Sequence, residues 1–163
     1  MNELDRTSSF AAPRTGFMLV TVAICTWNRC TLLEQGLESL TAVRVPPGVD
    51  WRIIVIDNNC TDRTAEVVEP FTRRLPLTRI VEPVAGLSHA RNRALAEATG
   101  DVIAFLDDDA RVAEQWLEAL AGSVARRPDG VAFGGPVDPW FPHEPDPDLV
   151  AAYPPLGQGF CGL

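Results

Sequence analysis

Short apolar runs alternate with stretches of helical periodicity along most of the chain. Four runs rich in β-branched or aliphatic residues have the length of buried strands, at residues 18–25, 51–56, 78–82 and 101–106. A much shorter run at 131–133 is predicted to form a fifth strand. This regular alternation predicts an α/β fold in which a mostly parallel sheet is covered on both faces.

Between these runs, apolar residues recur three or four positions apart, as on one face of a helix. Helices are predicted at 31–40, 88–99 and 115–124. The apolar face of the first consists of Leu33, Leu37 and Leu40. That of the second consists of Ala90, Ala94, Leu95 and Ala98. Gly100 then stands where a helix end favours glycine.

Another short helix is expected after the turn-rich residues 57–59. Thr61 and Asp62 are both suited to cap it, because their side-chain oxygens accept hydrogen bonds from free backbone N–H groups. It should stop or kink at Pro70, because proline does not fit a regular helix interior.

Both ends of the chain depart from this pattern. Residues 1–17 are expected to form a flexible segment, so that one domain occupies 18–135. Residues 136–163 hold seven of the 14 prolines and no periodicity. We interpret them as an irregular segment ordered by something absent from this chain, rather than as a disordered tail. Four aromatic residues argue against a solvated linker: Trp140, Phe141, Tyr153 and Phe160.

Charge and composition narrow the class of protein. A net charge of −8 gives no electrostatic footprint for nucleic acid, so no nucleic-acid partner is expected. All 14 basic residues are arginines, which excludes Schiff-base and P-loop lysines. The four cysteines form no C-x-x-C pair, and neither a signal peptide nor a transmembrane segment is visible. A cytoplasmic protein is therefore expected, with peripheral attachment to a membrane left open.

Three polar clusters directly follow predicted strands, at residues 26–29, 57–59 and 107–109. In an open parallel sheet, ligands bind at the carboxyl edge, where the loops and the helix N-termini converge. All three clusters are therefore expected on one rim, where they suit a polar ligand with several recognisable parts.

Asp107 and Asp109 form the most specific of these signals. Residues two apart on an extended segment point the same way, so both carboxylates are expected to face the ligand. Such oxygens suit Mg²⁺ or Mn²⁺, and the cation would bridge a diphosphate. A solvated acidic turn that caps the next helix remains the alternative.

Asp57, Trp27 and Arg91 are candidates for contacts with a nucleotide. A carboxylate only accepts hydrogen bonds, so Asp57 suits the imide N–H of uracil or thymine, or the N1–H of guanine. An Asx turn without a ligand is its alternative. Trp27 either stacks on the base or packs in the core. Arg91 lies in the first turn of a predicted helix, where it meets either an anionic ligand or a structural ion pair.

Four motifs in this order resemble family 2 glycosyltransferases, over about residues 18–135. They are Ile24-Cys25-Thr26-Trp27-Asn28-Arg29, Val55-Ile56-Asp57-Asn58-Asn59-Cys60-Thr61-Asp62, Gly86-Leu87-Ser88-His89-Ala90-Arg91-Asn92 and Phe105-Leu106-Asp107-Asp108-Asp109. The resemblance implies a GT-A fold, a Rossmann-like α/β/α sandwich that is incomplete at the C-terminal end of this chain. It makes 18–135 the nucleotide-sugar-binding domain and 136–163 the lead into a missing acceptor half.

The resemblance also assigns the site residues. Nucleotide-sugar binding is implied for Thr26, Trp27, Asn28, Arg29, Asp57, Arg91, Asp107 and Asp108. Asp109 is the metal ligand of a DxD motif, and Asp107 approaches the metal or the ribose. The implied cofactor is Mn²⁺ or Mg²⁺.

The implied reaction is metal-dependent transfer of a sugar, with inversion, from a UDP-, dTDP- or GDP-sugar to the hydroxyl of an unknown acceptor. The family's general base lies well downstream of the DxD motif, and the last acids of this chain do not match its motif, so no base is assigned. They are Asp138, Glu144, Asp146 and Asp148.

Three hypotheses follow. The chain is a glycosyltransferase that is active within a longer product or with a partner, a donor-binding module without turnover, or a different α/β protein. The third is disfavoured because no G-x-G-x-x-G follows the first strand. A homo-oligomer is a further expectation, because an unfinished sheet edge tends to be covered.

Overall fold

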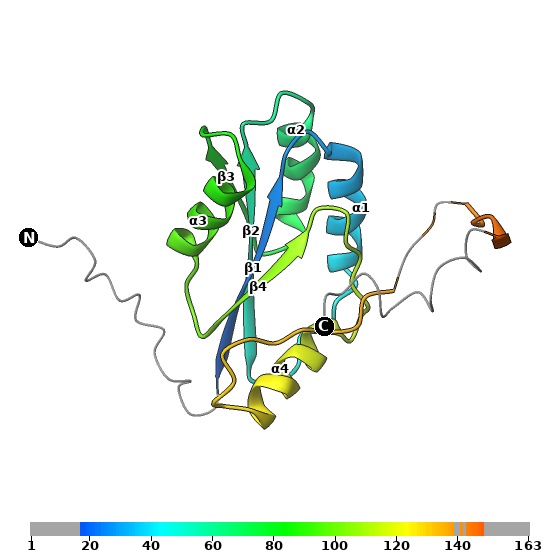
Figure 1. Cartoon of the computed structure of the whole chain (residues 1–163). Coiled ribbons are helices and arrows are strands. Elements are labelled where there is room, and N and C mark those ends of the chain that lie inside the picture. The colour runs from blue at the N-terminus through cyan, green and yellow to red at the C-terminus, as the bar shows by residue number, and fades with distance from the viewer. Residues whose placement is uncertain (1–16, 139–140, 142, 149–163) are drawn as a thin grey trace, which may run out of the picture. The chain divides into compact units, whose positions relative to one another are not determined.

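A computed structural model describes residues 17–138, 141 and 143–148 of the chain. Its strands are β1 (Met18–Thr26), β2 (Val49–Asn58), β3 (Leu77–Glu82) and β4 (Val102–Asp107). They form one sheet in the order β3-β2-β1-β4, and every pair is parallel (Figure 1). The α/β class with a parallel sheet is thereby confirmed.

Helices connect these strands. They are α1 (Cys30–Leu40), α2 (Thr64–Val68), the 3₁₀ helix η1 (Glu69–Arg73), α3 (Leu87–Glu97) and α4 (Trp116–Arg126). The change from α2 to η1 falls next to Pro70, which stands at the start of the 3₁₀ turn. The predicted stop at this proline is thus confirmed, because its ring excludes a continued α-helix.

The two faces of the sheet carry different cores, because successive side chains of a strand point to opposite faces. The face covered by α1, α2 and α4 is built from Val20, Val22, Ile24, Ile53, Val55, Leu33, Leu37, Val68 and Leu117. The opposite face packs against α3 through Ala23, Ile54, Ile56, Ala90 and Ala94. Each fully buried Leu, Ile or Val contributes about 1.5–3 kcal/mol.

This alternation also sorts the polar residues at the carboxyl edge. Residues 53, 55 and 57 of β2 point to the α1 face, whereas 54, 56 and 58 point to the α3 face. By the same alternation, residue 107 at the end of β4 belongs to the α3 face and residue 108 to the α1 face.

Two local predictions are wrong. Residues 131–133 form no strand, and Val131 is fully exposed. This run is flanked by Gly130 and Gly134, so it is too short and too weakly restrained to bury a strand face. Leu95, predicted on the apolar face of its helix, is 50% exposed, because α3 contacts the sheet only through small residues such as Ala90 and Ala94.

Contacts divide the chain into two compact units, Met1–Ala125 and Arg126–Leu163. The limits predicted for the domain, 18 and 135, stay a prediction. Residues 1–16 of the predicted flexible segment, and residues 139–140, 142 and 149–163 of the predicted irregular segment, lie outside the described residues. Among the helices that are described, none is long and apolar enough to cross a membrane.

Candidate functional site

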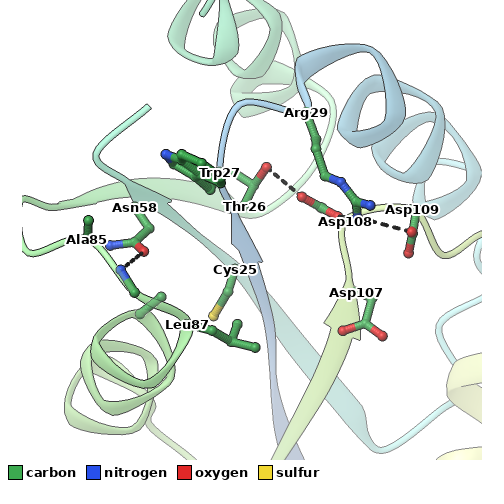
Figure 2. Close-up of a pocket in the computed structure, with 12 residues that line it drawn as sticks. Cys25, Thr26, Trp27, Arg29, Asn58, Ala85, Leu87, Asp107, Asp108 and Asp109 are labelled. Carbon is green, nitrogen blue, oxygen red and sulfur yellow. Dashed lines mark hydrogen bonds and ion pairs between the residues drawn. The ribbon is translucent and has the colours of Figure 1, made fainter. Parts of the chain in front are cut away.

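A pocket of about 550 Å³ opens at the carboxyl edge of the sheet (Figure 2). Its walls come from the ends of β1 and β4, from Asn58 at the end of β2, and from the start of α3. This volume lies within the range of small-molecule sites, and the edge is where parallel α/β sheets bind ligands. The pocket brings together Thr26, Trp27, Arg29, Asp107, Asp108 and Asp109 of the predicted site residues.

The three consecutive acids of this pocket do not share one environment. Asp107 and Asp109 are exposed, whereas Asp108 is 6% exposed and points inward. Thr26 donates a hydrogen bond from Oγ1 to Asp108 at 2.8 Å. Nη1 of Arg29 lies 2.9 Å from Asp108 and 3.1 Å from Asp109 (Figure 2). The buried Asp108 thus stands between two exposed carboxylates, and the expectation that Asp107 and Asp109 face one ligand stays a prediction.

Arg29 is the cation of this acidic cluster. It stands at the N-cap position of α1, directly after the loop that follows β1. Hydrogen bonding and charge attraction to Asp108 raise the pKa of Arg29, with a smaller contribution from Asp109. The side chain of Arg29 thereby links the loop that follows β1 to the acids that follow β4.

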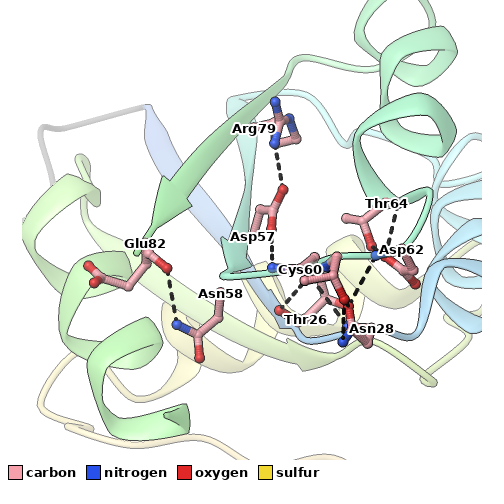
Figure 3. A network of polar contacts seen from close by, with 10 residues as sticks. Thr26, Asn28, Asp57, Asn58, Cys60, Asp62, Thr64, Arg79 and Glu82 are labelled. Carbon is pink, nitrogen blue, oxygen red and sulfur yellow. Dashed lines mark hydrogen bonds and ion pairs between the residues drawn. The ribbon is translucent and has the colours of Figure 1, made fainter. Parts of the chain in front are cut away.

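Asp57 lies outside this pocket lining. It belongs to β2, which continues two residues further than predicted, and its side chain is on the face opposite to that of Asn58. The carboxylate is buried, accepts a hydrogen bond from the backbone N–H of Cys60 at 3.0 Å, and pairs with Arg79 of β3 (Figure 3). Asp57 thus does not line the pocket that contains Asp107, Asp108 and Asp109, and its role in reading a base stays a prediction.

Asn58 lines the pocket where Asp57 does not. Its side-chain amide donates hydrogen bonds to the carbonyl oxygens of Val84 at 2.6 Å and Glu82 at 3.3 Å, and its oxygen accepts one from Gly86 N–H at 2.8 Å. Gly86 has φ 133°, a conformation that favours glycine. Asn58 therefore fixes the loop that leads into α3. In the sequence, the alternation of side chains along β2 is the pattern that indicates that Asn58 and Asp57 lie on opposite faces of the sheet.

The loops after β1 and β2 are joined by polar side chains (Figure 3). Asn28 has φ 53° and accepts a hydrogen bond at Oδ1 from the backbone N–H of Thr61 at 2.7 Å. Asp62 accepts hydrogen bonds at 3.0 Å from the backbone N–H of Cys30 in α1 and from that of Thr64 in α2. The N-cap residue of α2 is Arg63, and not the predicted Thr61 or Asp62. The carboxylate of Asp62 nevertheless accepts backbone N–H groups at the start of two helices.

The environment of Asp62 lowers its pKa. Partial burial raises the pKa, but hydrogen bonds from Thr64 and Cys30 outweigh it and lower it to about 2. Asp62 is therefore ionised at neutral pH. Asn28 and Asp62 hold the loop that carries Trp27, although neither of them lines the pocket.

Two further residues complete the surroundings. Arg91 is exposed on α3, does not line the pocket, and has no hydrogen bond or ion pair within the described part of the chain. Burial raises the pKa of the Cys25 thiol to about 11, the charge of Arg91 opposes this shift, and Asp107 adds to it. The thiol is therefore protonated at neutral pH.

The residues at the pocket suit a cation that shares its ligands with a phosphate. In the region that the structure describes, no three His, Cys, Asp or Glu side chains gather closely enough to hold a metal ion by themselves. Mg²⁺ usually takes one or two carboxylates and completes its shell with phosphate oxygens and water. The exposed carboxylates of Asp107 and Asp109 fit that smaller set.

The parallel sheet, its helical layers and the polar carboxyl edge define a GT-A-like α/β protein. The model of the family described as Glycosyl transferase family 2 matches residues 21–148. The chain belongs to this family.

Its relatives are glycosyltransferases or proteins of polysaccharide synthesis. The succinoglycan biosynthesis protein ExoM of Rhizobium meliloti is 37% identical over 120 residues, which are 72% of this chain and 38% of ExoM. TarS 1-349 of S. aureus, solved with UDP-GlcNAc, has a TM-score of 0.62 and 26% identity over 68% of this chain and 32% of that one.

A third relative is the mannosyltransferase PcManGT of Pyrobaculum calidifontis, solved with GDP-Man and Mn²⁺. It has a TM-score of 0.61 and 30% identity, over 71% of this chain and 34% of that one. This chain thus spans only about a third of the length of the relatives it matches.

Proposed function

We propose that this chain forms the donor-binding part of an inverting, metal-dependent glycosyltransferase. A nucleoside diphosphate sugar of the UDP, dTDP or GDP type would bind at the pocket, and an acceptor hydroxyl would receive the sugar. The observation that carries this proposal is the pair of exposed carboxylates, Asp107 and Asp109, on the wall of a pocket at the carboxyl edge of the sheet.

The relatives support the class of donor. TarS was solved with UDP-GlcNAc, and PcManGT with GDP-Man and Mn²⁺. Both donors are sugars linked to a nucleoside diphosphate, so a diphosphate and a base are the features they share. Titration with different nucleotide sugars would identify the base and the sugar that this chain accepts.

Each residue of the pocket has a proposed task. Asp109 and Asp107 hold Mn²⁺ or Mg²⁺, which neutralises negative charge on the diphosphate as it leaves. Asp108 keeps Arg29 and Thr26 in place through its hydrogen bonds. Trp27, 62% exposed at the rim, offers an aromatic face for a base.

Asp57 and Arg91 are assigned to the nucleotide on weaker support, because neither lines the pocket. Each carboxylate oxygen of Asp57 can accept more than one hydrogen bond, so the pair with Arg79 leaves acceptor capacity for an imide N–H. Arg91 has no partner within the described residues, so its guanidinium is available to an anion.

Calorimetric titration with UDP-, dTDP- and GDP-sugars, with and without Mn²⁺, tests the proposal. We expect binding that depends on Mn²⁺ in the wild type, a loss of that dependence in Asp109→Ala, and a much smaller effect in Asp108→Ala. An equal loss of Mn²⁺-dependent binding in both variants would contradict the assignment of the cation to Asp107 and Asp109 rather than to Asp108. Asp57→Asn is expected to weaken binding of UDP and to leave the metal requirement intact.

A donor-binding module without turnover is the second candidate. Binding of a nucleotide sugar without release of free nucleoside diphosphate, in the presence of acceptor extracts, would support the module over the enzyme.

A further inference from the structure

The guanidinium of Arg29 pairs with Asp109, one of the two acids to which the cation is assigned, and with Asp108. The geometry points to Arg29 as a resident counter-ion, which releases Asp109 when a divalent cation binds there and remains on Asp108. This inference rests on the metal site of the proposed function, and it assigns to Arg29 a positioning role that the family resemblance does not supply.

Arg29 holds its two acids through one nitrogen. Nη1 lies 2.9 Å from Oδ1 of Asp108 and 3.1 Å from Oδ2 of Asp109. Both acids therefore depend on the position of a single group, and a cation that binds Asp109 must compete with it.

The two pairs differ in how easily they open. The side chain of Asp108 is only 7% exposed, and a buried carboxylate that loses its partner is strongly destabilised. The side chains of Arg29 and Asp109 are 51% and 47% exposed, and ion pairs this exposed contribute little to stability. Thr26 also holds Asp108 at 2.8 Å. Arg29 therefore releases Asp109 well before Asp108.

The acids gain a better partner by this exchange. Within the described residues, Arg29 is the one partner of the Asp109 carboxylate, and that of Asp107 has none. A divalent cation carries twice the charge of Arg29, so it attracts the Asp109 carboxylate more strongly. A guanidinium left against Asp109 would repel the cation, so the two positive groups exclude each other.

Removing the charge of Arg29 should therefore strengthen binding of the cation by itself. In Arg29→Gln, the side-chain amide still donates to Asp108, but the competitor at Asp109 is gone. We expect Mn²⁺ alone to bind about two- to fivefold more tightly, which corresponds to the free energy of an exposed ion pair. The gain should shrink as salt is added.

Two variants are matched controls. Arg29→Lys keeps a positive charge at the site and should leave the Mn²⁺ affinity close to that of the wild type. Arg44→Gln removes the same charge from an exposed pair with Glu114, which lies outside the pocket lining, so it measures the effect of net charge alone.

Electron paramagnetic resonance of free Mn²⁺ measures these affinities without nucleotide. Tighter binding in Arg29→Gln only, relative to the wild type, Arg29→Lys and Arg44→Gln, would support the counter-ion role. If Arg29→Gln binds Mn²⁺ as tightly as the wild type or less tightly, the counter-ion role is overturned. An arginine with a purely structural role would lower the Mn²⁺ affinity when it is removed. If the wild type binds no Mn²⁺ even with UDP present, the metal site of the proposed function fails as well.

A measurement on the wild type keeps the test independent of the folding of any variant. Side-chain NMR of the Arg29 guanidinium, titrated with diamagnetic Mg²⁺ and UDP, should show faster rotation and faster proton exchange as the cation binds. An Arg29 signal that does not change while UDP and Mg²⁺ bind would overturn the proposal that the cation displaces Arg29 from Asp109.

Discussion

Asp62 is the residue whose single side chain supports the largest part of the site. It accepts hydrogen bonds from the first residue of α1 and from the first residue of α2, and Asn28 contacts the backbone of the same loop. Free N–H groups at helix N-termini are stabilised by an acceptor that carries negative charge. The orientation of the β1–α1 loop therefore depends on an acid outside the pocket.

The low pKa of Asp62 gives this role a pH dependence. The folded pKa is about 2 against an ordinary 3.8, so ionised Asp62 stabilises the fold above the ordinary value. That contribution is lost as the pH falls through the folded pKa. Asp62→Asn should cost about 1 kcal/mol of unfolding free energy at pH 7, a value reduced to allow for the exposure of this side chain.

Urea unfolding of the wild type and of Asp62→Asn at pH 7 and pH 3 checks this prediction. The difference between them should fall to about half at pH 3. Glu66→Gln is the matched control, because it removes an exposed acid from the first turn of the same helix, α2. A difference that is the same at both pH values would show that Asp62 acts through its shape and not through its charge.

The secondary structure elements show why some predictions succeeded. The strands β1 and β2 and the helix α1 were predictable because they pack into the covered sheet and carry long apolar patterns. Residues 131–133 carry no such long pattern. They are three apolar residues between glycines, so they match the composition of a strand but are too few to bury one of its faces.

The end of β2 was mispredicted for a different reason. The residues Asp57-Asn58-Asn59 are typical of a turn, but β2 pairs with β1 at Asp57 and with β3 at both Asp57 and Asn58. Strand pairing on both sides thus overrode local turn preference. As a result Asn58, and not Asp57, faces the pocket, which motif spacing alone could not reveal.

The β3–α3 loop depends on the amide of Asn58. Asn58→Asp removes both donors and places a carboxylate against the carbonyl oxygens of Val84 and Glu82. We expect a loss of about 1–3 kcal/mol, because buried acceptors lose their partners. Hydrogen exchange of residues 82–87 should accelerate, and binding of the nucleotide sugar should weaken.

The same substitution at an exposed asparagine of α3 serves as the control. The side chain of Asn92 is exposed and has no hydrogen bond to another described side chain or backbone group, so Asn92→Asp should leave the exchange of residues 82–87 unchanged. Unaltered exchange in Asn58→Asp would mean that Gly86 and the start of α3 hold the loop without help from Asn58.

At the scale of the whole molecule, the first unit brings the residues of the pocket to one edge, from the ends of β1, β2 and β4 and from the start of α3. The strands β3 and β4 are the outer strands of the sheet formed by the described residues. Phe105 of β4 is 42% exposed, and Leu87 and Leu95 of α3 are 54% and 50% exposed. The expectation of a homo-oligomer stays a prediction.

Binding at this edge should stabilise the whole fold. A ligand that binds only the folded state adds about 2.7 kcal/mol when its concentration is 100 times its dissociation constant. For a chain of this size, this corresponds to a rise of about 5–10 °C in the midpoint of thermal unfolding. UDP and Mn²⁺ together should therefore raise the midpoint of the wild type, and EDTA should remove most of the rise.

Thermal unfolding of wild type, Asp109→Ala and Asp108→Ala with UDP, with and without Mn²⁺, separates the metal from the nucleotide. Asp109→Ala should lose the part of the rise that depends on Mn²⁺, because the cation can no longer link the carboxylates to the diphosphate. Asp108→Ala should start from a lower midpoint, since Arg29 and Thr26 lose their buried partner, yet retain a rise with Mn²⁺. A rise in Asp109→Ala as large as in the wild type would place the cation elsewhere on the molecule.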